Sequence, residues 1–132
     1  KSKTMSTLAV GTIKSVSSAA PVIQNSSGEE KGQFAKAWAN LSGDSNPPTL
    51  RSSFNVSSVT DQGNGDYTFN FSVSMANGNY VCIPSASNGN DGAFAITQDN
   101  AMATGSQRCV YRTSRTSSAT DFPLSMMVVF GT

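Results

Sequence analysis

The chain contains no histidine, and this absence excludes several kinds of catalytic and metal site. Histidine is the commonest general base, the commonest metal ligand and the side chain that titrates near neutral pH. One copy of the chain therefore cannot build a Ser/His/Asp or Cys/His triad. Its two cysteines alone cannot complete a zinc tetrahedron. We expect no catalytic residue, no metal site and no cofactor, and we predict that the protein is not an enzyme.

Charge is also scarce. Charged residues make up 13% of the 132 residues, and nine Lys and Arg against eight Asp and Glu leave a net charge of +1. Sequence-independent binding to nucleic acid needs clustered basic residues that displace counterions from phosphate, and here they are scattered. No apolar run approaches the about 18 residues that can span a bilayer. These observations predict no nucleic-acid partner and no membrane insertion.

Small polar residues dominate what remains. Ser, Thr, Asn and Gly supply 56 residues, so we expect a neutral, hydrogen-bonding surface. The length suits one domain. A chain of this size buries roughly 68–70% of its unfolded surface on folding, enough for a core without covalent staples. The chain begins at Lys1 without an initiator methionine, which is compatible with a processed or excised piece.

Cys82 and Cys109 each lie in a short apolar run, with 26 residues between them. Buried free thiols behave as small apolar side chains. A disulfide is the alternative, and it requires the two Cα atoms to lie within about 7 Å. The spacing leaves both possibilities open.

The pattern of the chain favours strands over helices. No long segment has a convincing 3.6-residue apolar period, whereas β-branched, aromatic and turn residues are common. Residues 67–74 alternate apolar and polar side chains and follow the dipeptide Asn64-Gly65, which is typical of a tight hairpin turn. We therefore predict that 67–74 pairs antiparallel with a long strand at 50–61. The apolar parity of that strand changes near Ser57 and Ser58, which predicts a bulge.

Fold class follows from these signals. We predict an all-β domain at residues 34–132, with about eight short antiparallel strands in a β-sandwich or jelly-roll-like arrangement. Residues 1–33 are rich in Ser and Thr and have no aromatic residue. They are predicted to be an N-terminal stem, with ordinary edge strands as the alternative. Candidate strands there are 8–13 and 22–23.

Trp38 lies in a segment, Phe34 to Leu41, that alternates only in part. Phe34 and Trp38 have the same parity, and we predict from this that Trp38 belongs to the core. The alternative is a platform on which a sugar ring stacks. A short strand at Tyr80–Ile83 is expected to end at Pro84.

The last predicted strand, residues 124–130, has hardly any polar face. A strand that is apolar on both faces must be covered on both, and in a small domain the second cover can come from another chain. We predict a subunit interface there, with a two-sided intramolecular core as the alternative. The candidate interface residues are Leu124, Met126, Met127, Val128, Val129 and Phe130.

Two sets of polar residues are candidate ligand sites. The loop with Asn88, Asn90 and Asp91 offers oxygen ligands, but it lacks the acidic residues of a calcium loop and also suits an ordinary turn. A second set could bind anionic glycans through bidentate guanidinium groups, or could simply lie on the solvent face of a strand. It consists of Arg108, Arg112 and Arg115.

Four blocks of the sequence resemble virion proteins of tailed phages. Residues 35–43, AKAWANLSG, are similar to the block AKAWVNF(D/N)G of those proteins, although Ala39 and Leu41 replace Val and Phe. The likeness continues through 51–61 (RSSFNVSSVTD), 64–71 (NGDYTFNF) and 75–80 (MANGNY), and so covers roughly residues 34–81. It implies a trimeric or otherwise symmetric appendage or surface protein, and not an enzyme.

The functional prediction combines composition and resemblance. We expect a phage virion structural protein, a tail-fibre or surface-appendage domain that contributes to host attachment. Its expected partners are copies of itself in a homotrimer, other virion proteins and a host surface glycan, and its expected location is the surface of the virion. Two alternatives stay open: a capsid decoration or head-fibre protein, and a secreted carbohydrate-binding module or adhesin.

Overall fold

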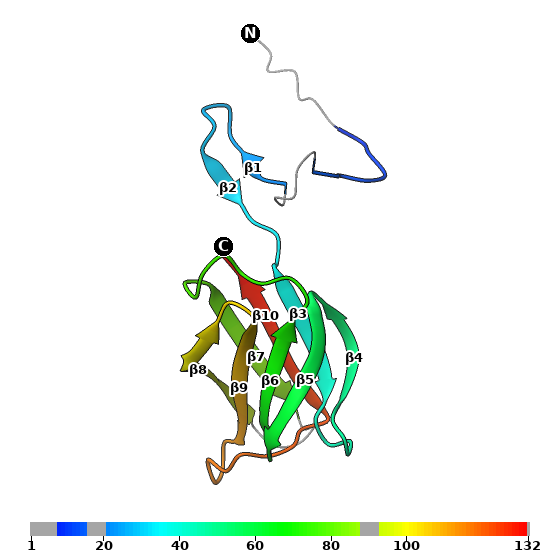
Figure 1. Cartoon of the computed structure of the whole chain (residues 1–132), viewed down its shortest axis with the longest axis vertical. Coiled ribbons are helices and arrows are strands. Elements are labelled where there is room, and N and C mark those ends of the chain that lie inside the picture. The colour runs from blue at the N-terminus through cyan, green and yellow to red at the C-terminus, as the bar shows by residue number, and fades with distance from the viewer. Residues whose placement is uncertain (1–7, 16–20, 88–92, 132) are drawn as a thin grey trace. The chain divides into compact units, whose positions relative to one another are not determined.

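The computed structural model describes residues 8–15, 21–87 and 93–131, with no side-chain detail at 98–101 (Figure 1). The chain divides into two compact units, Lys1–Gln33 and Phe34–Thr132. Each unit is described by itself.

The first unit contains a small hairpin. Strands β1 (Ile23–Gln24) and β2 (Glu30–Gly32) pair antiparallel. The turn between them is held by Asn25, whose Oδ1 accepts the backbone N–H groups of Ser27 (3.0 Å) and Glu29 (2.9 Å). Residues 8–15 form no strand, so the strand expected at 8–13 is wrong.

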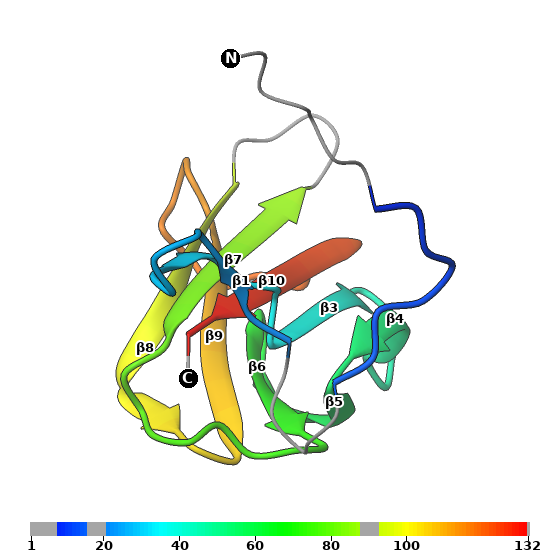
Figure 2. The same ribbon diagram turned by 90° about the horizontal axis from the view of Figure 1, so that it is seen from above.

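The second unit is a sandwich of two four-stranded antiparallel sheets, which confirms the all-β prediction (Figures 1 and 2). The first sheet has the order β4-β3-β10-β7 and the second the order β5-β6-β9-β8. Seen from above, β4 and β5 lie together at one edge of the sandwich, and β7 and β8 lie together at the other (Figure 2). The strands are β3 (Ala37–Ser42), β4 (Thr49–Phe54), β5 (Val56–Gly63), β6 (Asp66–Phe71), β7 (Val81–Ser87), β8 (Ala93–Ala103), β9 (Ser106–Thr113) and β10 (Leu124–Phe130).

Asn55 carries the chain from the first sheet to the second. The single strand predicted at 50–61 is wrong, because Asn55 has a φ of 54° and divides it into β4 and β5. Its side-chain amide donates to the carbonyl oxygens of Lys36 and Val73, both at 3.0 Å, and its Oδ1 accepts the N–H of Val73 at 2.7 Å. The predicted irregularity near Ser57 is also present, since the β5–β6 register shifts between Val56 and Ser58.

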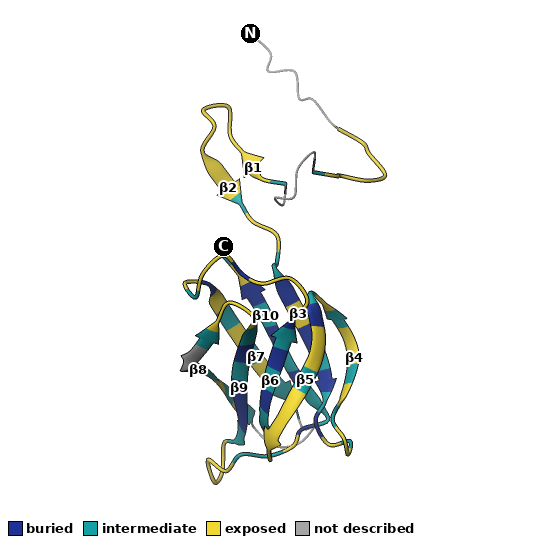
Figure 3. Cartoon of the chain, viewed as in Figure 1, coloured by how far each residue is buried: buried dark blue, intermediate teal, exposed yellow. Residues whose placement is uncertain are grey.

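The core lies between the sheets and is filled mainly by aromatic rings. On β6 the buried side chains are Tyr67, Phe69 and Phe71, in the predicted alternation, and β9 adds Tyr111 (Figure 3). The rings of Tyr67 and Tyr111 lie with their centroids 6.0 Å apart. The predicted pairing of β5 with β6 across Asn64-Gly65 is confirmed.

Trp38 does not belong to this core, so that prediction is wrong. The buried residues of β3 are Ala37, Ala39 and Leu41, whereas Trp38 is 38% exposed and Phe34 is 49% exposed. The rings contributed by the opposite sheet occupy most of the interior, and small side chains on β3 leave space for them. Strand alternation then places Trp38 on the outer face.

Strand β7 also differs from expectation, because it continues past Pro84 to Ser87. Proline has no N–H to donate to a sheet, and it is tolerated on edge strands. β7 is an edge strand that pairs with β10 alone, so Pro84 lies where the missing donor removes no required bond.

A partly buried polar corner joins three loops at one end of the sandwich. The carboxylate Oδ1 of Asp121 accepts the hydroxyl of Tyr67 and the N–H of Gly65, each at 2.6 Å. The N–H of Gly43 donates to the carbonyl of Phe122 at 2.9 Å. Gly65 has a φ of 60° and its Cα faces the backbone of Thr120, so there is no room for a side chain.

Replacing Gly65 with alanine should destabilise the domain by more than about 2 kcal/mol, because the new Cβ would meet the Thr120 backbone and because the left-handed conformation strains any other residue. Urea unfolding measures this loss. Gly11→Ala is the control, since nothing lies within 4 Å of a Cβ built there. Equal free energies of unfolding for the two variants would contradict the close contact between Gly65 and the Thr120 backbone.

All three tyrosines should stay protonated in the folded protein at pH 10. Burial raises the pKa of Tyr80 to about 12 and also raises those of Tyr67 and Tyr111 well above the usual value. The unfolded chain ionises near pH 10, so folding stability is complete below that pH and falls as the pH rises through about 12. Tyrosinate absorbance measures the titration. Ionisation of the folded protein at pH 10 would contradict the buried positions.

Candidate functional site

Strand β10 divides the predicted interface residues between the two faces of its sheet. Met127 and Val129 point into the domain and are 3% and 0% exposed, so they are not available to another molecule. The other four alternate with them and lie on the outer face: Leu124, Met126, Val128 and Phe130. The structure therefore reduces the candidate interface on this strand to these four side chains.

These side chains belong to an apolar row that crosses the whole sheet. Phe54 on β4 is the register partner of Trp38 on β3, Trp38 is the partner of Val128 on β10, and Val128 is the partner of Ile83 on β7. Register partners share a face of a sheet. Three strand spacings give the row a length of about 14 Å.

A second, shorter row extends the apolar surface. Phe130 is the register partner of Val81, and they are 37% and 58% exposed. Phe54 and Ile83 are each 53% exposed. We call this outer surface of β4-β3-β10-β7 the apolar face, and define it by Trp38, Phe54, Val81, Ile83, Leu124, Met126, Val128 and Phe130.

The apolar face carries almost no charge. Among the four strands of its sheet, Arg51 is the one charged residue, and it lies at the β3–β4 register irregularity. Its guanidinium donates to Ser42 Oγ at 2.9 Å and to the Pro123 carbonyl at 3.0 Å, at one end of the sheet. Beside the long row, Ser52, Asn40, Met126 and Ser85 are successive register partners. The surface is thus apolar at its centre and neutral and polar beside it.

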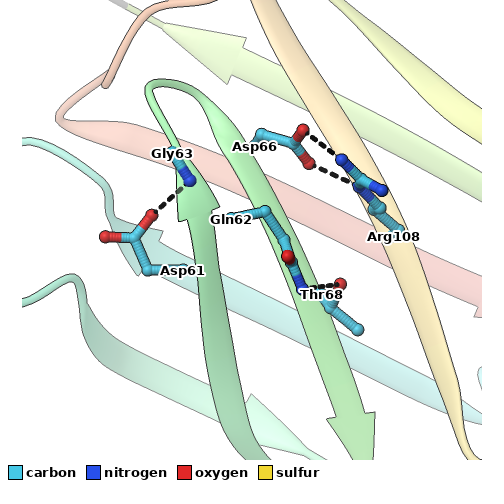
Figure 4. Close-up of polar contacts among 6 residues, drawn as sticks. All are labelled: Asp61, Gln62, Gly63, Asp66, Thr68 and Arg108. Carbon is cyan, nitrogen blue, oxygen red and sulfur yellow. Dashed lines mark hydrogen bonds and ion pairs between the residues drawn. The ribbon is translucent and has the colours of Figure 1, made fainter.

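The outer face of the other sheet is polar over β5 and β6 and partly apolar over β8, where Phe94 and Ile96 are 38% and 40% exposed and are the register partners of Arg112 and Val110. Its polar side chains bond to one another: Asn70 Nδ2 donates to Ser58 Oγ (3.1 Å) and to Thr60 Oγ1 (3.0 Å). Nearer the turn of the same β5–β6 hairpin, Gln62 Nε2 donates to Thr68 Oγ1 at 3.3 Å (Figure 4). The hydroxyl-and-amide part of this face, on β5 and β6, is well solvated and does not need cover by another molecule.

Arg108 lies on that polar face and is already paired. Its Nε and one terminal nitrogen contact the two carboxylate oxygens of Asp66 at 2.8 and 2.6 Å, a bidentate ion pair between β9 and β6 (Figure 4). The Asp66 carboxylate raises the pKa of Arg108. Asp66 occupies one edge of this guanidinium and neutralises its charge, which weakens it as a site for an anionic ligand.

The other two candidate arginines do not complete a site with Arg108. Arg112 lies four residues along the same strand face, about 13 Å away, and donates to the carbonyl of Ser117 at 2.7 Å. Arg115 is exposed in the turn that follows β9. Arg108 and Arg112 share the solvent face of β9, which is the arrangement expected if they bind no ligand and simply lie on the surface of a strand.

The third candidate set, Asn88, Asn90 and Asp91, lies outside the described residues. Within residues 8–15, 21–87 and 93–131, no group of three or more acidic or cysteine side chains is placed to hold a metal. The same part of the chain contains no helix long and apolar enough to cross a membrane.

No protein-family model, curated protein or solved structure matches the chain. The apolar face is therefore the candidate site on physical grounds alone.

Sequence reasoning missed four of its members: Trp38, Phe54, Val81 and Ile83. A signal for Trp38 was present, because Ala37, Ala39 and Leu41 form an alternating apolar set of the opposite parity. For Phe54 and Ile83 the signal is weaker, since their face depends on the break at Asn55 and on the continuation of β7 through Pro84.

Because Arg108 is paired with Asp66, we predict that the native chain does not bind a small anion at this position. Calorimetric titration with inorganic pyrophosphate should detect no binding to the native chain, because Asp66 occupies the guanidinium, and should detect weak binding to Asp66→Ala. Binding to the native chain that disappears in Arg108→Gln would contradict this result.

Proposed function

We propose that the chain is a structural part of a tailed-phage particle, a tail-fibre or surface-appendage domain, in which copies of the chain pack together through the apolar face. The resemblance of residues 34–81 to phage virion proteins supports the assignment of the chain to a phage particle. The absence of histidine supports a structural role. The location on the particle surface and the homotrimer belong to the same proposal.

One observation carries the proposal: the outer-face row Phe54–Trp38–Val128–Ile83, in which all but the half-buried Val128 are exposed. Soluble monomers rarely expose a contiguous apolar patch above a few hundred Å². Five members of the apolar face are each between 37% and 58% exposed: Trp38, Phe54, Val81, Ile83 and Phe130. Interface centres are likewise depleted in charge and enriched in aromatic residues and Met.

The lack of charge favours a second copy of the chain as the occupant. A strongly charged surface would repel its own copy and would need an oppositely charged partner. The apolar face has no such repulsion, and hydroxyl and amide groups beside it can supply hydrogen bonds around a seam. A standard interface hides about 800 Å² on each partner. An interface of that size would extend beyond the apolar row and would include the neighbouring polar residues Ser52, Asn40 and Ser85.

A second candidate function is attachment to a host surface glycan, and the exposure of Trp38 favours it. Aromatic rings stack on the C–H faces of sugars, and Asn40 and Ser52 lie beside Trp38 and Phe54 on the same face. Glycan binding and self-association would compete for this surface. Binding of envelope oligosaccharide that is lost in Trp38→Ala, by a protein of monomeric mass, would select this alternative.

Light scattering on the purified chain should give three times 13.8 kDa. Val128→Asp should reduce the mass to that of one chain, because it places a charge at the centre of the apolar face and so within the interface between copies. The substitution leaves the core residues Met127 and Val129 in place. Thr60→Asp is the matched control, since it adds the same charge to the polar face of the other sheet.

A native chain that is monomeric at micromolar concentration would contradict self-association through the apolar face. An unchanged mass of Val128→Asp would do so as well. Immunogold labelling of phage particles tests the placement: label on tails or appendages supports it, label on heads selects a decoration protein, and particles without label contradict a virion role.

A further inference from the structure

The two cysteines come from opposite sheets and meet in the core. Cys82 lies on β7 of the first sheet and Cys109 on β9 of the second, and their Sγ atoms are 3.8 Å apart. Both are free thiols in this structure. Cys109 is fully buried, whereas Cys82 is half-buried on an edge strand.

The position of the pair matters because the sandwich has two unlike edges. At the β4–β5 edge the chain itself passes from one sheet to the other, and Asn55 fixes that passage with three hydrogen bonds. At the opposite edge, β7 faces β8 and β9. There Thr97, the register partner of Cys109, donates its hydroxyl to the Cys82 carbonyl at 3.2 Å.

We propose that Cys82 and Cys109 are an oxidative modification site, and that a small-molecule disulfide converts them to an intersheet disulfide that closes the β7 edge of the sandwich. The bond requires a sulfur–sulfur distance near 2.05 Å. The two sulfurs must therefore approach by about 1.8 Å from their 3.8 Å contact, a movement shared between two side chains.

The chemistry is two successive thiol–disulfide exchanges. The Cys82 thiolate attacks one sulfur of the oxidant RSSR, which forms a Cys82–SR mixed disulfide and releases RS⁻. Cys109 then loses its proton to the released thiolate and attacks the Cys82 sulfur, which breaks the mixed disulfide and releases the second RS⁻. That thiolate takes up the proton first lost by Cys82. Two protein thiols and RSSR become one protein disulfide and two RSH, and two electrons pass to the oxidant.

The order of attack follows from the surroundings of the two thiols. Cys82 is the more accessible, and its contact with the Cys109 thiol, helped by Thr97, lowers its pKa. The same contact, together with burial, raises the pKa of Cys109. The thiolate is the attacking form, so Cys82 reacts first and Cys109 resolves the mixed disulfide.

The test is intact-mass spectrometry of the full chain after incubation with oxidised glutathione, beside a sample kept in dithiothreitol. We expect the oxidised chain to be monomeric on a non-reducing gel, to lose about 2 Da relative to the reduced chain, and to have no free thiol when denatured. Its Tm should rise by about 10 °C, because the bond spans 26 intervening residues of the unfolded chain.

Cys82→Ser and Cys109→Ala should each abolish the loss of mass and the rise in Tm. The native-chain mass decides the question even if a variant fails to fold. An unchanged mass, a stable gain of one or two glutathione groups, or covalently linked chains would each overturn the intersheet disulfide. None of these outcomes depends on whether copies of the chain associate through the apolar face.

Discussion

Strand alternation links the interior of this domain to its exterior. The rings of Tyr67, Phe69 and Tyr111 fill the space between the sheets, and Ala37 and Ala39 lie on the inner face of the opposite sheet. Because successive side chains of a strand point to opposite faces, burial of these alanines places Trp38 outside. In the same way, burial of Met127 and Val129 places Val128 outside. The packing of the core thus generates the apolar face.

The two outer faces of the sandwich then differ in what they require. On one, Asn70 bonds to Ser58 and Thr60, and Arg108 bonds to Asp66. These groups are satisfied within the chain and tolerate water. On the other, Trp38 and Ile83 gain free energy when they leave water, at about 25 cal/mol for each Å² hidden. The apolar row of the first sheet crosses all four strands, whereas the exposed large apolar residues of the second sheet, Phe94 and Ile96, are confined to β8, and this difference is the physical basis for placing self-association on the first sheet.

The sequence was informative where a local signal decides the structure. Asn64-Gly65 identified the β5–β6 hairpin, and the clean alternation from Tyr67 to Phe71 identified the core face of β6. Both the antiparallel all-β class and the irregularity near Ser57 followed from such patterns.

Other features depended on tertiary context. Residues 34–41 place apolar side chains at both parities, so the inner face of β3 could not be assigned without knowing which rings oppose it. Asparagine tolerates the left-handed conformation, and at Asn55 the partners that hold its side chain there, Lys36 and Val73, are distant in sequence. Likewise, Pro84 is acceptable in β7 because that strand lies at an edge. Which residues of 124–130 belong to the core and which to the surface could be assigned only once the position of β10 in its sheet was known.

Trp38 is the single tryptophan of the chain and lies in the middle of the apolar face, so its fluorescence reports directly on what covers that face. Acrylamide quenching of Trp38 should be weak at high protein concentration and should rise on dilution, with a shift of the emission to longer wavelength, as copies separate and water reaches the indole. Strong quenching that is independent of protein concentration would show that no second copy covers Trp38 and would contradict the account.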